Sequence, residues 1–123
     1  MELIVKCADT SNVIRPHKVA RRWAIRVTDE FFRQGDLEAQ HGLEVSAICD
    51  RKKQTRVGIQ KGFIDFVIGP FYRKIATVFP SLKEDIGQLW INRECWDSWD
   101  DQTLEAEDLQ FRVSALNPKP YSL

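Results

Sequence analysis

The stretch RVGIQKGFIDFVIGPFYRKIATVF, residues 56–79, has the apolar spacing that decides the fold of this chain. Apolar side chains recur every three or four residues, which is the period of an amphipathic helix. We predict one helix over this stretch, kinked at Gly69-Pro70, because an internal proline lacks a backbone N–H and clashes with the preceding turn. The residues expected to face the core are Ile59, Phe63, Phe66, Val67, Phe71, Ile75 and Val78.

Three further segments on either side of this stretch also have helical patterns. Residues 2–9 read as the end of a buried helix, and Ser81 with Glu84 has the spacing of a capping box that begins a helix over residues 82–99. Residues 18–40 carry a large apolar residue at every fourth position, namely Val19, Trp23, Val27 and Phe31. The predicted fold class is therefore all-α.

The remaining segments are predicted to lack regular structure. Residues 43–55 read as a loop that turns Ile48 inward. Between residues 94 and 108 there are seven acidic residues and no basic one, which is typical of a solvated segment. We expect a helical part over residues 1–100, followed by an acidic and largely disordered tail over residues 101–123.

The composition is that of a soluble globular protein without bulk charge. The 123 residues include 18 Lys plus Arg and 18 Asp plus Glu, so no net charge attracts nucleic acid or an anionic membrane. No segment approaches the about 20 apolar residues of a membrane span, and no signal peptide is recognisable. Cys7, Cys49 and Cys95 lack the spacing of a disulfide framework or a zinc site, which predicts a reducing, cytoplasmic location.

Gln60 and Phe63 are the first candidates for a binding site. Three residues apart on a helix, their side chains share one face. The amide can donate and accept hydrogen bonds at the edge of a flat heterocycle, while the ring stacks on its plane. This combination suits a purine pocket, although the same spacing also suits a surface amide beside a core ring.

Five blocks of sequence, in order, resemble the C-terminal part of the catalytic domain of class I 3′,5′-cyclic nucleotide phosphodiesterases. The likeness extends over roughly residues 3 to 99 by its motifs. It implies the C-terminal helices of a multi-helix hydrolase domain of signal transduction, which converts cAMP, cGMP or both to the 5′-monophosphate. The blocks are Cys7 to Asn12, Trp23, Glu30 to Asp36, Cys49 to Arg51 and Gln60 to Phe66.

The resemblance also assigns roles to single residues. It implies that Asp9 is the last aspartate ligand of a centre that holds two divalent ions, zinc with magnesium or manganese. It implies that Asn12 and Gln60 contact the nucleotide and that Phe63 stacks on its base. The apolar positions that complete the clamp are Val27, Phe31 and Ile48.

Some features of the family are absent from this sequence. The family places its histidine metal ligands and its histidine proton donor upstream of the position that Asp9 matches, and neither His17 nor His41 corresponds to them. Both histidines are expected to be exposed helix caps. Val13 stands where the family often has proline, and Lys61 stands where it has a branched apolar residue, so Lys61 is expected to point outward.

We therefore expect a fragment of the catalytic domain that contains no catalytic residue of its own and is inactive in isolation. The complete domain is expected to bind the cyclic nucleotide, to bind no nucleic acid and to be able to form a homodimer. A different function also remains open. The chain could be a non-catalytic helical module, derived from the same family, that binds a nucleotide or a protein.

Overall fold

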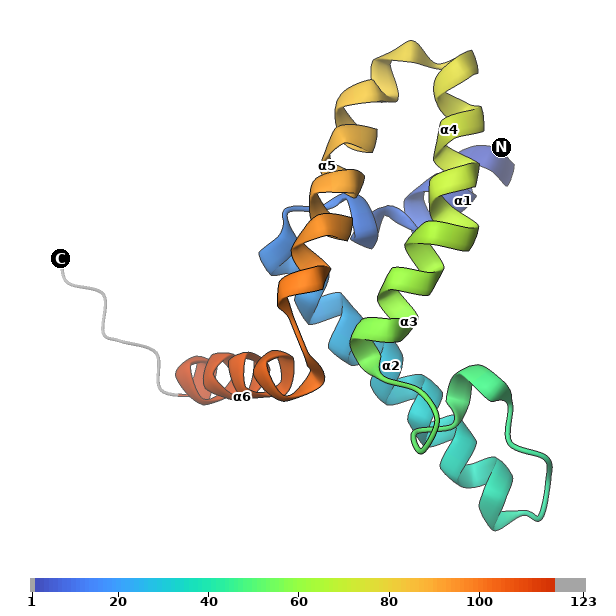
Figure 1. Ribbon diagram of the computed structural model, residues 1–123, viewed down its shortest axis with the longest axis vertical. Coiled ribbons are helices and arrows are strands. Elements are labelled where there is room, and N and C mark those ends of the chain that lie inside the picture. Colours follow the sequence, from blue (N-terminus) through green and yellow to red (C-terminus); the bar gives the residue numbers. More distant parts are fainter. Residues whose placement is uncertain (1, 117–123) are drawn as a thin grey trace, which may run out of the picture.

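In a computed structural model that describes residues 2–116, the chain consists of α-helices joined by short turns (Figure 1). No strand occurs in these residues, and the prediction of an all-α fold is confirmed. One-turn 3-10 helices cover Ser11–Ile14, Ala47–Cys49, Pro80–Leu82 and Trp96–Ser98. The α-helices are α1 (Glu2–Asp9), α2 (His17–Gln40), α3 (Arg56–Phe63), α4 (Gly69–Val78), α5 (Lys83–Cys95) and α6 (Asp101–Leu116).

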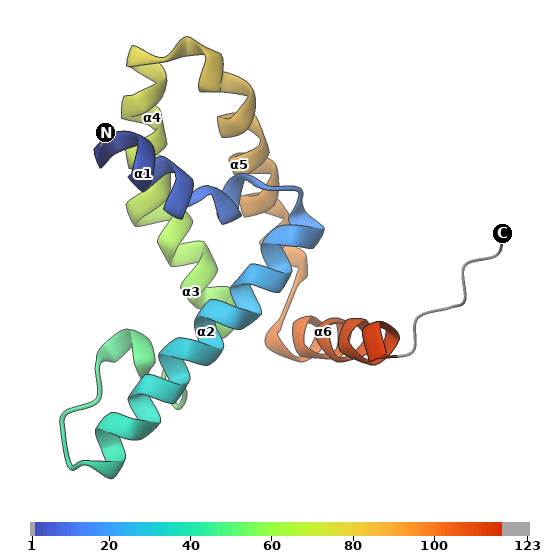
Figure 2. The ribbon, with the colours of Figure 1, turned by 180° about the vertical axis from the view of Figure 1, so that it is seen from behind.

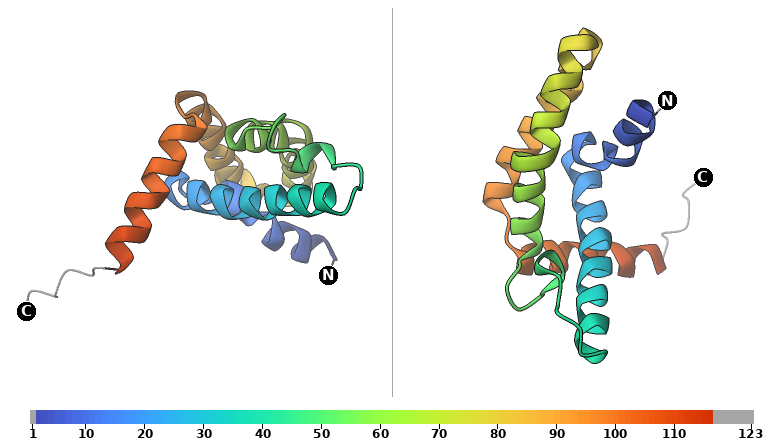
Figure 3. Two further views of the ribbon diagram at one scale, coloured as in Figure 1. Left: turned by 90° about the horizontal axis from the view of Figure 1, so that it is seen from below. Right: turned by 90° about the vertical axis from the view of Figure 1, so that its right-hand side faces the viewer.

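Helices α3 and α4 form one long rod that turns back into α5, and α2 crosses this hairpin (Figures 1 and 2). Figure 3 shows α2 running beside the rod, with the loop over residues 41–55 joining their ends. Helix α1 is tied to α4 because the hydroxyl of Tyr72 donates a hydrogen bond to the carbonyl oxygen of Cys7, at 3.1 Å. None of the helices within residues 2–116 has the length and apolar character of a membrane span.

The core lies where α2 meets α3, α4 and α5. Ala24 and Thr28 of α2 are fully buried, and their small side chains allow the helices to approach closely. Trp96 is the largest of the fully buried side chains, and burying a large apolar side chain contributes about 1.5–3 kcal/mol. The other members of the core are Val13, Ile25, Val57, Ile64, Ile68, Tyr72, Leu89 and Leu104.

The apolar stripe predicted on the second helix does not form the core-facing side of α2. Val19 is 39% exposed and Trp23 is 49% exposed. The core-facing side consists of smaller residues that contribute little to a hydrophobicity pattern, together with Ile25 and Phe32. Its members are Ala20, Ala24, Ile25, Thr28, Phe32 and Gly35.

A π-helical segment, Ile64–Ile68, joins α3 to α4 directly before the predicted kink. The N–H of Gly69 bonds to the carbonyl oxygen of Ile64, five residues back, so the helical path continues past Pro70, which has no N–H to donate. A π turn holds more residues than an α turn, so the side chains within it depart from the regular helical spacing. Phe66 and Val67, which lie in this segment and were predicted to face the core, are 83% and 51% exposed, and Val78, also predicted to face the core, is 67% exposed.

Helix α6 replaces much of the disordered tail predicted over residues 101–123, of which residues 117–123 lie outside the described part of the chain. Its first turn is capped by Asp100, whose carboxylate accepts a hydrogen bond from the N–H of Thr103 at 2.7 Å. The run of acidic residues thus contains a helix start, a feature that overall charge does not reveal.

Contacts with other helices hold α6 in place. Leu104 is 1% exposed and belongs to the core. Arg21 of α2 donates two hydrogen bonds of 2.6 Å to Glu107, and Arg56 of α3 pairs with Glu105 at 2.8 Å. These acidic side chains are therefore paired across helix interfaces.

Two local predictions near helix ends are also wrong. Helix α1 buries none of its residues, and Ile4 is 73% exposed. The capping box predicted from Ser81 and Glu84 does not form, because a 3-10 turn over Pro80–Leu82 leads into α5, which begins at Lys83 without a side-chain cap.

Candidate functional site

A pocket of about 220 Å³ lies between the end of α1, helix α2, the loop over residues 41–55 and helix α3. Its lining includes all seven site residues that the sequence singled out. The structure therefore brings together residues that are up to 54 positions apart in the chain, from position 9 to position 63. The lining consists of Asp9, Thr10, Asn12, Val27, Phe31, Ile48, Ile59, Gln60 and Phe63.

Helices α2 and α3 form two walls of the pocket. Gln60 and Phe63 lie one turn apart on α3, and Gln60 is only 4% exposed. A buried primary amide that opens on a pocket can donate and accept hydrogen bonds from one position. Val27 and Phe31 lie one turn apart on α2, so apolar surface lines the pocket from a second helix.

Ile48 reaches the pocket from the loop over residues 41–55. It is 45% exposed and lies at the rim, whereas the neighbouring Cys49 is the residue that turns inward, at 3% exposed. Burial raises the pKa of the Cys49 thiol above its ordinary value. Ile48 was expected to turn inward. Its side chain does not enter the core and lines the rim of the pocket instead.

The loop that carries Ile48 is fastened to α2. At Gly35, an added Cβ would lie 2.1 Å from the carbonyl oxygen of Cys49, so only glycine allows this approach. Arg51 donates two hydrogen bonds, of 2.9 and 2.6 Å, to Asp36. A hydrogen bond from the backbone N–H of Ser46 lowers the pKa of the Glu38 carboxyl.

Asp9 and Asn12 lie where α1 ends and the chain turns toward α2. The hydroxyl of Thr10 donates a hydrogen bond to the carbonyl oxygen of Lys6 at 2.8 Å, which closes the last turn of α1. Beyond Asn12, the side chain of Asn92 donates hydrogen bonds of 2.7 Å to two backbone carbonyls, those of Val13 and Arg15.

Asn92 is a supporting residue that the sequence analysis missed. It is 1% exposed, and its amide oxygen accepts a hydrogen bond from Gln88 at 2.9 Å. A buried asparagine with partners on both sides fixes the backbone that it contacts. The sign of this role in the sequence is that a polar asparagine stands among the apolar residues of the last predicted helix.

The pocket lining contains one carboxylate, that of Asp9. Within residues 2–116 no group of three or more His, Cys, Asp or Glu side chains is close enough to hold an ion. Zinc and magnesium sites in proteins use several ligands. Residues 2–116 therefore do not fit a complete metal centre by themselves.

The two histidines are far from equivalent. His41 is exposed at the end of α2, as predicted, but His17 is not an exposed cap. The ring of His17 packs edge-on against that of Trp96, with the two ring centres 4.8 Å apart. Both nitrogens of His17 are buried without a hydrogen-bond partner. Burial, with the charge of Arg21, lowers the pKa of His17 to about 4. Neither histidine lines the pocket.

Lys61 points away from the pocket, as predicted. Its ammonium pairs with the carboxylate of Asp97 at 2.5 Å, which lowers the pKa of Asp97. The residue therefore connects α3 to the turn after α5, and Gln60 and Phe63 beside it remain directed to the pocket.

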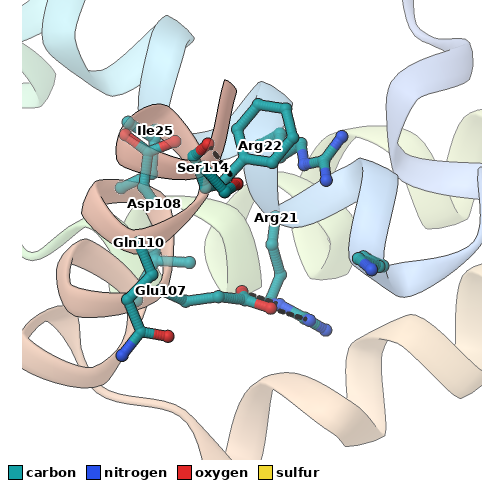
Figure 4. A pocket seen from close by; sticks show the side chains of 10 residues that line it. Arg21, Arg22, Ile25, Glu107, Asp108, Gln110 and Ser114 are labelled. Carbon is teal, nitrogen blue, oxygen red and sulfur yellow. Dashed lines mark hydrogen bonds and ion pairs between the residues drawn. The ribbon is translucent and has the colours of Figure 1, made fainter. Parts of the chain in front are cut away.

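Further hollows lie along α2, and two of them are clearly larger than the pocket. One, of about 400 Å³, adjoins the pocket and shares Asp9, Asn12 and Val27 with it, with Trp23 as a further wall. The other, of about 340 Å³, lies between α2 and α6 and contains none of the predicted site residues (Figure 4). We call it the α2–α6 cavity.

Residues 1–89 match the 3′,5′-cyclic nucleotide phosphodiesterase family. Over 115 residues, or 93% of its length, the chain is 34% identical to the high affinity cGMP-specific 3′,5′-cyclic phosphodiesterase 9A of Mus musculus, of which it covers 22%. Over 99 residues, or 80% of its length, it is 37% identical to the probable 3′,5′-cyclic-AMP phosphodiesterase pde-4 of Caenorhabditis elegans, of which it covers 15%. The chain thus spans about a fifth or less of these relatives.

The fold also matches a solved structure, that of LmjPDEB1 in complex with IBMX. The TM-score is 0.75 and the sequence identity is 41%. The match covers 80% of this chain and 30% of the other. Sequence and fold therefore point to the same family.

Proposed function

This chain belongs to the 3′,5′-cyclic nucleotide phosphodiesterase family, and we propose that it forms the part of such a catalytic domain that holds the purine ring of the substrate. The complete domain hydrolyses cAMP, cGMP or both to the 5′-monophosphate. The observation that carries the proposal is the convergence of seven residues, from four separate segments, on one pocket.

Each wall of the pocket has a part in binding the base. Gln60 hydrogen-bonds its edge, either donating to the carbonyl oxygen of guanine or accepting from the amino group of adenine. Phe63 stacks on the ring, and Val27 with Phe31 packs against it from α2. Stacking of this kind contributes about 1–3 kcal/mol per base. Recognition thus combines one buried amide with apolar contact.

The ends of the pocket orient the rest of the nucleotide. Asn12 contacts the ribose or the base, and Ile48 covers the base at the rim of the pocket. Asp9 is one ligand for a divalent metal ion whose other ligands come from outside residues 2–116. Divalent ions, when bound, neutralise charge on a phosphoryl group. The part of this chain is to bind and orient the nucleoside.

A second candidate function is a binding module that keeps the pocket without hydrolysis. The single carboxylate at the pocket within residues 2–116 favours it. The two functions differ in what happens when the preceding part of a related catalytic domain is supplied as a separate polypeptide. A catalytic part then releases 5′-monophosphate from cAMP or cGMP, whereas a module binds nucleotide and releases none.

Titration of the 123-residue chain with cAMP and with cGMP tests the pocket. We expect the side-chain amide signal of Gln60 in a 1H–15N NMR spectrum to shift on binding, and Gln60→Ala to weaken binding by about tenfold, the loss of roughly one hydrogen bond. Gln40→Ala, at the exposed end of α2, is the matched control. Equal affinity of Gln60→Ala and Gln40→Ala for both nucleotides would contradict the proposed pocket.

A further inference from the structure

The first turn of α3, the helix that carries Gln60 and Phe63, takes its cap from a distant part of the chain. A helix begins with backbone N–H groups that have no partner within the helix. The carboxylate of Asp101 accepts hydrogen bonds from two of them, those of Arg56 at 2.8 Å and Val57 at 3.0 Å. Locally, the hydroxyl of Thr55 accepts from the N–H of Gly58 at 3.0 Å.

Asp101 is the first residue of α6, and α6 is itself attached to α2. Arg21 of α2 donates two hydrogen bonds of 2.6 Å to Glu107, two turns further along α6. Leu104, between them, is buried in the core. Helix α6, whose Asp101 caps α3, is therefore held against α2, and α2 is the helix that supplies Val27 and Phe31 to the pocket.

Arg56 strengthens this connection. Its guanidinium pairs with Glu105 of α6 at 2.8 Å and with Asp29 of α2 at 2.8 Å. It also donates a hydrogen bond of 2.7 Å to the buried hydroxyl of Thr28. The side chain of Arg56 is only 11% exposed, whereas those of its partners Asp29 and Glu105 are 49% and 55% exposed.

We propose that Asp101 is a positioning residue for the pocket: by capping α3 from α6, it fixes α3 relative to α2 and so sets the place of Gln60 and Phe63 opposite Val27 and Phe31. Gln60 lies one turn after the capped residues, and two charged contacts at Arg56 keep the helices in register. The inference rests on the proposed function for its consequence in nucleotide binding, but the placement of Gln60 is measurable without a nucleotide.

Asp101→Ala in the full chain tests the placement directly. We expect the side-chain amide signal of Gln60 to shift in a 1H–15N NMR spectrum without nucleotide, and amide hydrogen exchange to rise at least fivefold through residues 56–63. Asp108→Ala is the matched control on α6, because Asp108 pairs with Arg112 on its own helix and makes no hydrogen bond or ion pair with α3. An unchanged Gln60 signal, with faster exchange confined to Arg56 and Val57, would mean that Asp101 is only a local cap.

A double-mutant cycle separates positioning from general loss of stability. If Asp101 acts by placing Gln60 and Phe63, Asp101→Ala weakens nucleotide binding about fivefold in the wild-type chain but has a smaller effect when Gln60→Ala is already present, because only the placement of Phe63 is then left to lose. Equal effects in both backgrounds overturn the inference. If Gln60→Ala alone leaves binding unchanged, the proposed pocket fails, while the signal of Gln60 in the free protein still decides whether Asp101 positions it.

Discussion

The pocket at Gln60 and the α2–α6 cavity lie on different sides of α2 and differ in the state of their polar groups. The α2–α6 cavity is the larger, at about 340 Å³ against about 220 Å³. In it, however, Arg21 pairs with Glu107, and the guanidinium of Arg22 lies 3.5 Å from the ring centre of Phe111 (Figure 4). Of the five charged side chains that line that cavity, all except Lys18 already have a partner within the described residues.

The smaller pocket has the composition of a ligand site. Its walls are largely apolar, and its few polar groups, those of Asp9, Asn12 and Gln60, converge on one space. Sites for small molecules usually combine an apolar lining with a few such groups. The comparison indicates that a binding site is distinguished from a gap between helices by polar groups that lack partners within the described part of the protein, and not by a larger volume.

The largest expected effect is a difference between two phenylalanines. Phe63→Ala removes the ring that we propose stacks on the base, and should weaken nucleotide binding by about 5- to 150-fold, the equivalent of roughly 1–3 kcal/mol. Phe111→Ala removes a ring of comparable size from the α2–α6 cavity and should leave the affinity unchanged. Isothermal titration calorimetry with cAMP and cGMP measures both. The reverse pattern would move the site to the α2–α6 cavity.

Gly35→Ala is expected to disturb the pocket by displacing the loop that lines one side of it. The new Cβ would lie 2.1 Å from the carbonyl oxygen of Cys49, so the loop that carries Ile48 must move. We expect the free energy of unfolding to fall by about 1–3 kcal/mol, with weaker nucleotide binding. Gly87→Ala in α5 is the control, because nothing lies within 4 Å of the added Cβ. Urea denaturation distinguishes them, and equal stability of the two variants would contradict the close packing.

His17, the first residue of α2, lies outside the pocket and tests the packing of the helices. Its neutral ring is buried without hydrogen bonds, so His17→Phe should raise the free energy of unfolding by about 1 kcal/mol. The pKa is about 4 in the folded protein and 6.5 ordinarily, so the wild type should lose stability as the pH falls from 6.5 to 4. Thermal denaturation should show this loss reduced in His17→Phe. A pH dependence identical to that of the wild type would show that His17 is solvated.

The smallest effect is expected at the ion pair that closes the α2–α6 cavity. Hydrogen bonds from Arg21 lower the pKa of Glu107 below its ordinary value of 4.5. The pair therefore stabilises the fold above pH 4.5, and its contribution is lost as the pH falls further. Glu107→Gln should reduce the free energy of unfolding at pH 7 by about 0.5 kcal/mol and lower nucleotide affinity less than Asp101→Ala does, because Leu104 and Glu105 still hold α6. A large loss of affinity would connect this cavity to binding.

The sequence predicted most of the helices and the members of the pocket. Periodicity located the helices up to residue 95, and the five blocks of resemblance selected residues that the structure brings together at one place. The core-facing side of α2 was not predicted, because alanine, threonine and glycine give little hydrophobic signal. The exposure of Phe66 follows from a π-helical turn that a regular helical period does not contain.

Contacts between distant residues were also beyond the reach of pattern analysis. Asp101 and Glu105 read as part of an acidic, solvated run, yet both bind Arg56 or its backbone more than 40 positions away. Asn92 likewise supports the turn after Asn12 from the far end of the chain. Such contacts depend on the packed arrangement of helices, and they determine how the pocket residues are held.

Intermolecular nuclear Overhauser effects between a bound cyclic nucleotide and the protein test the central claim most directly. The account predicts contacts from the purine H8 or H2 proton to the ring protons of Phe63 and Phe31, and to the methyl groups of Val27. Contacts from the purine to Phe111, with none to Phe63, would contradict it.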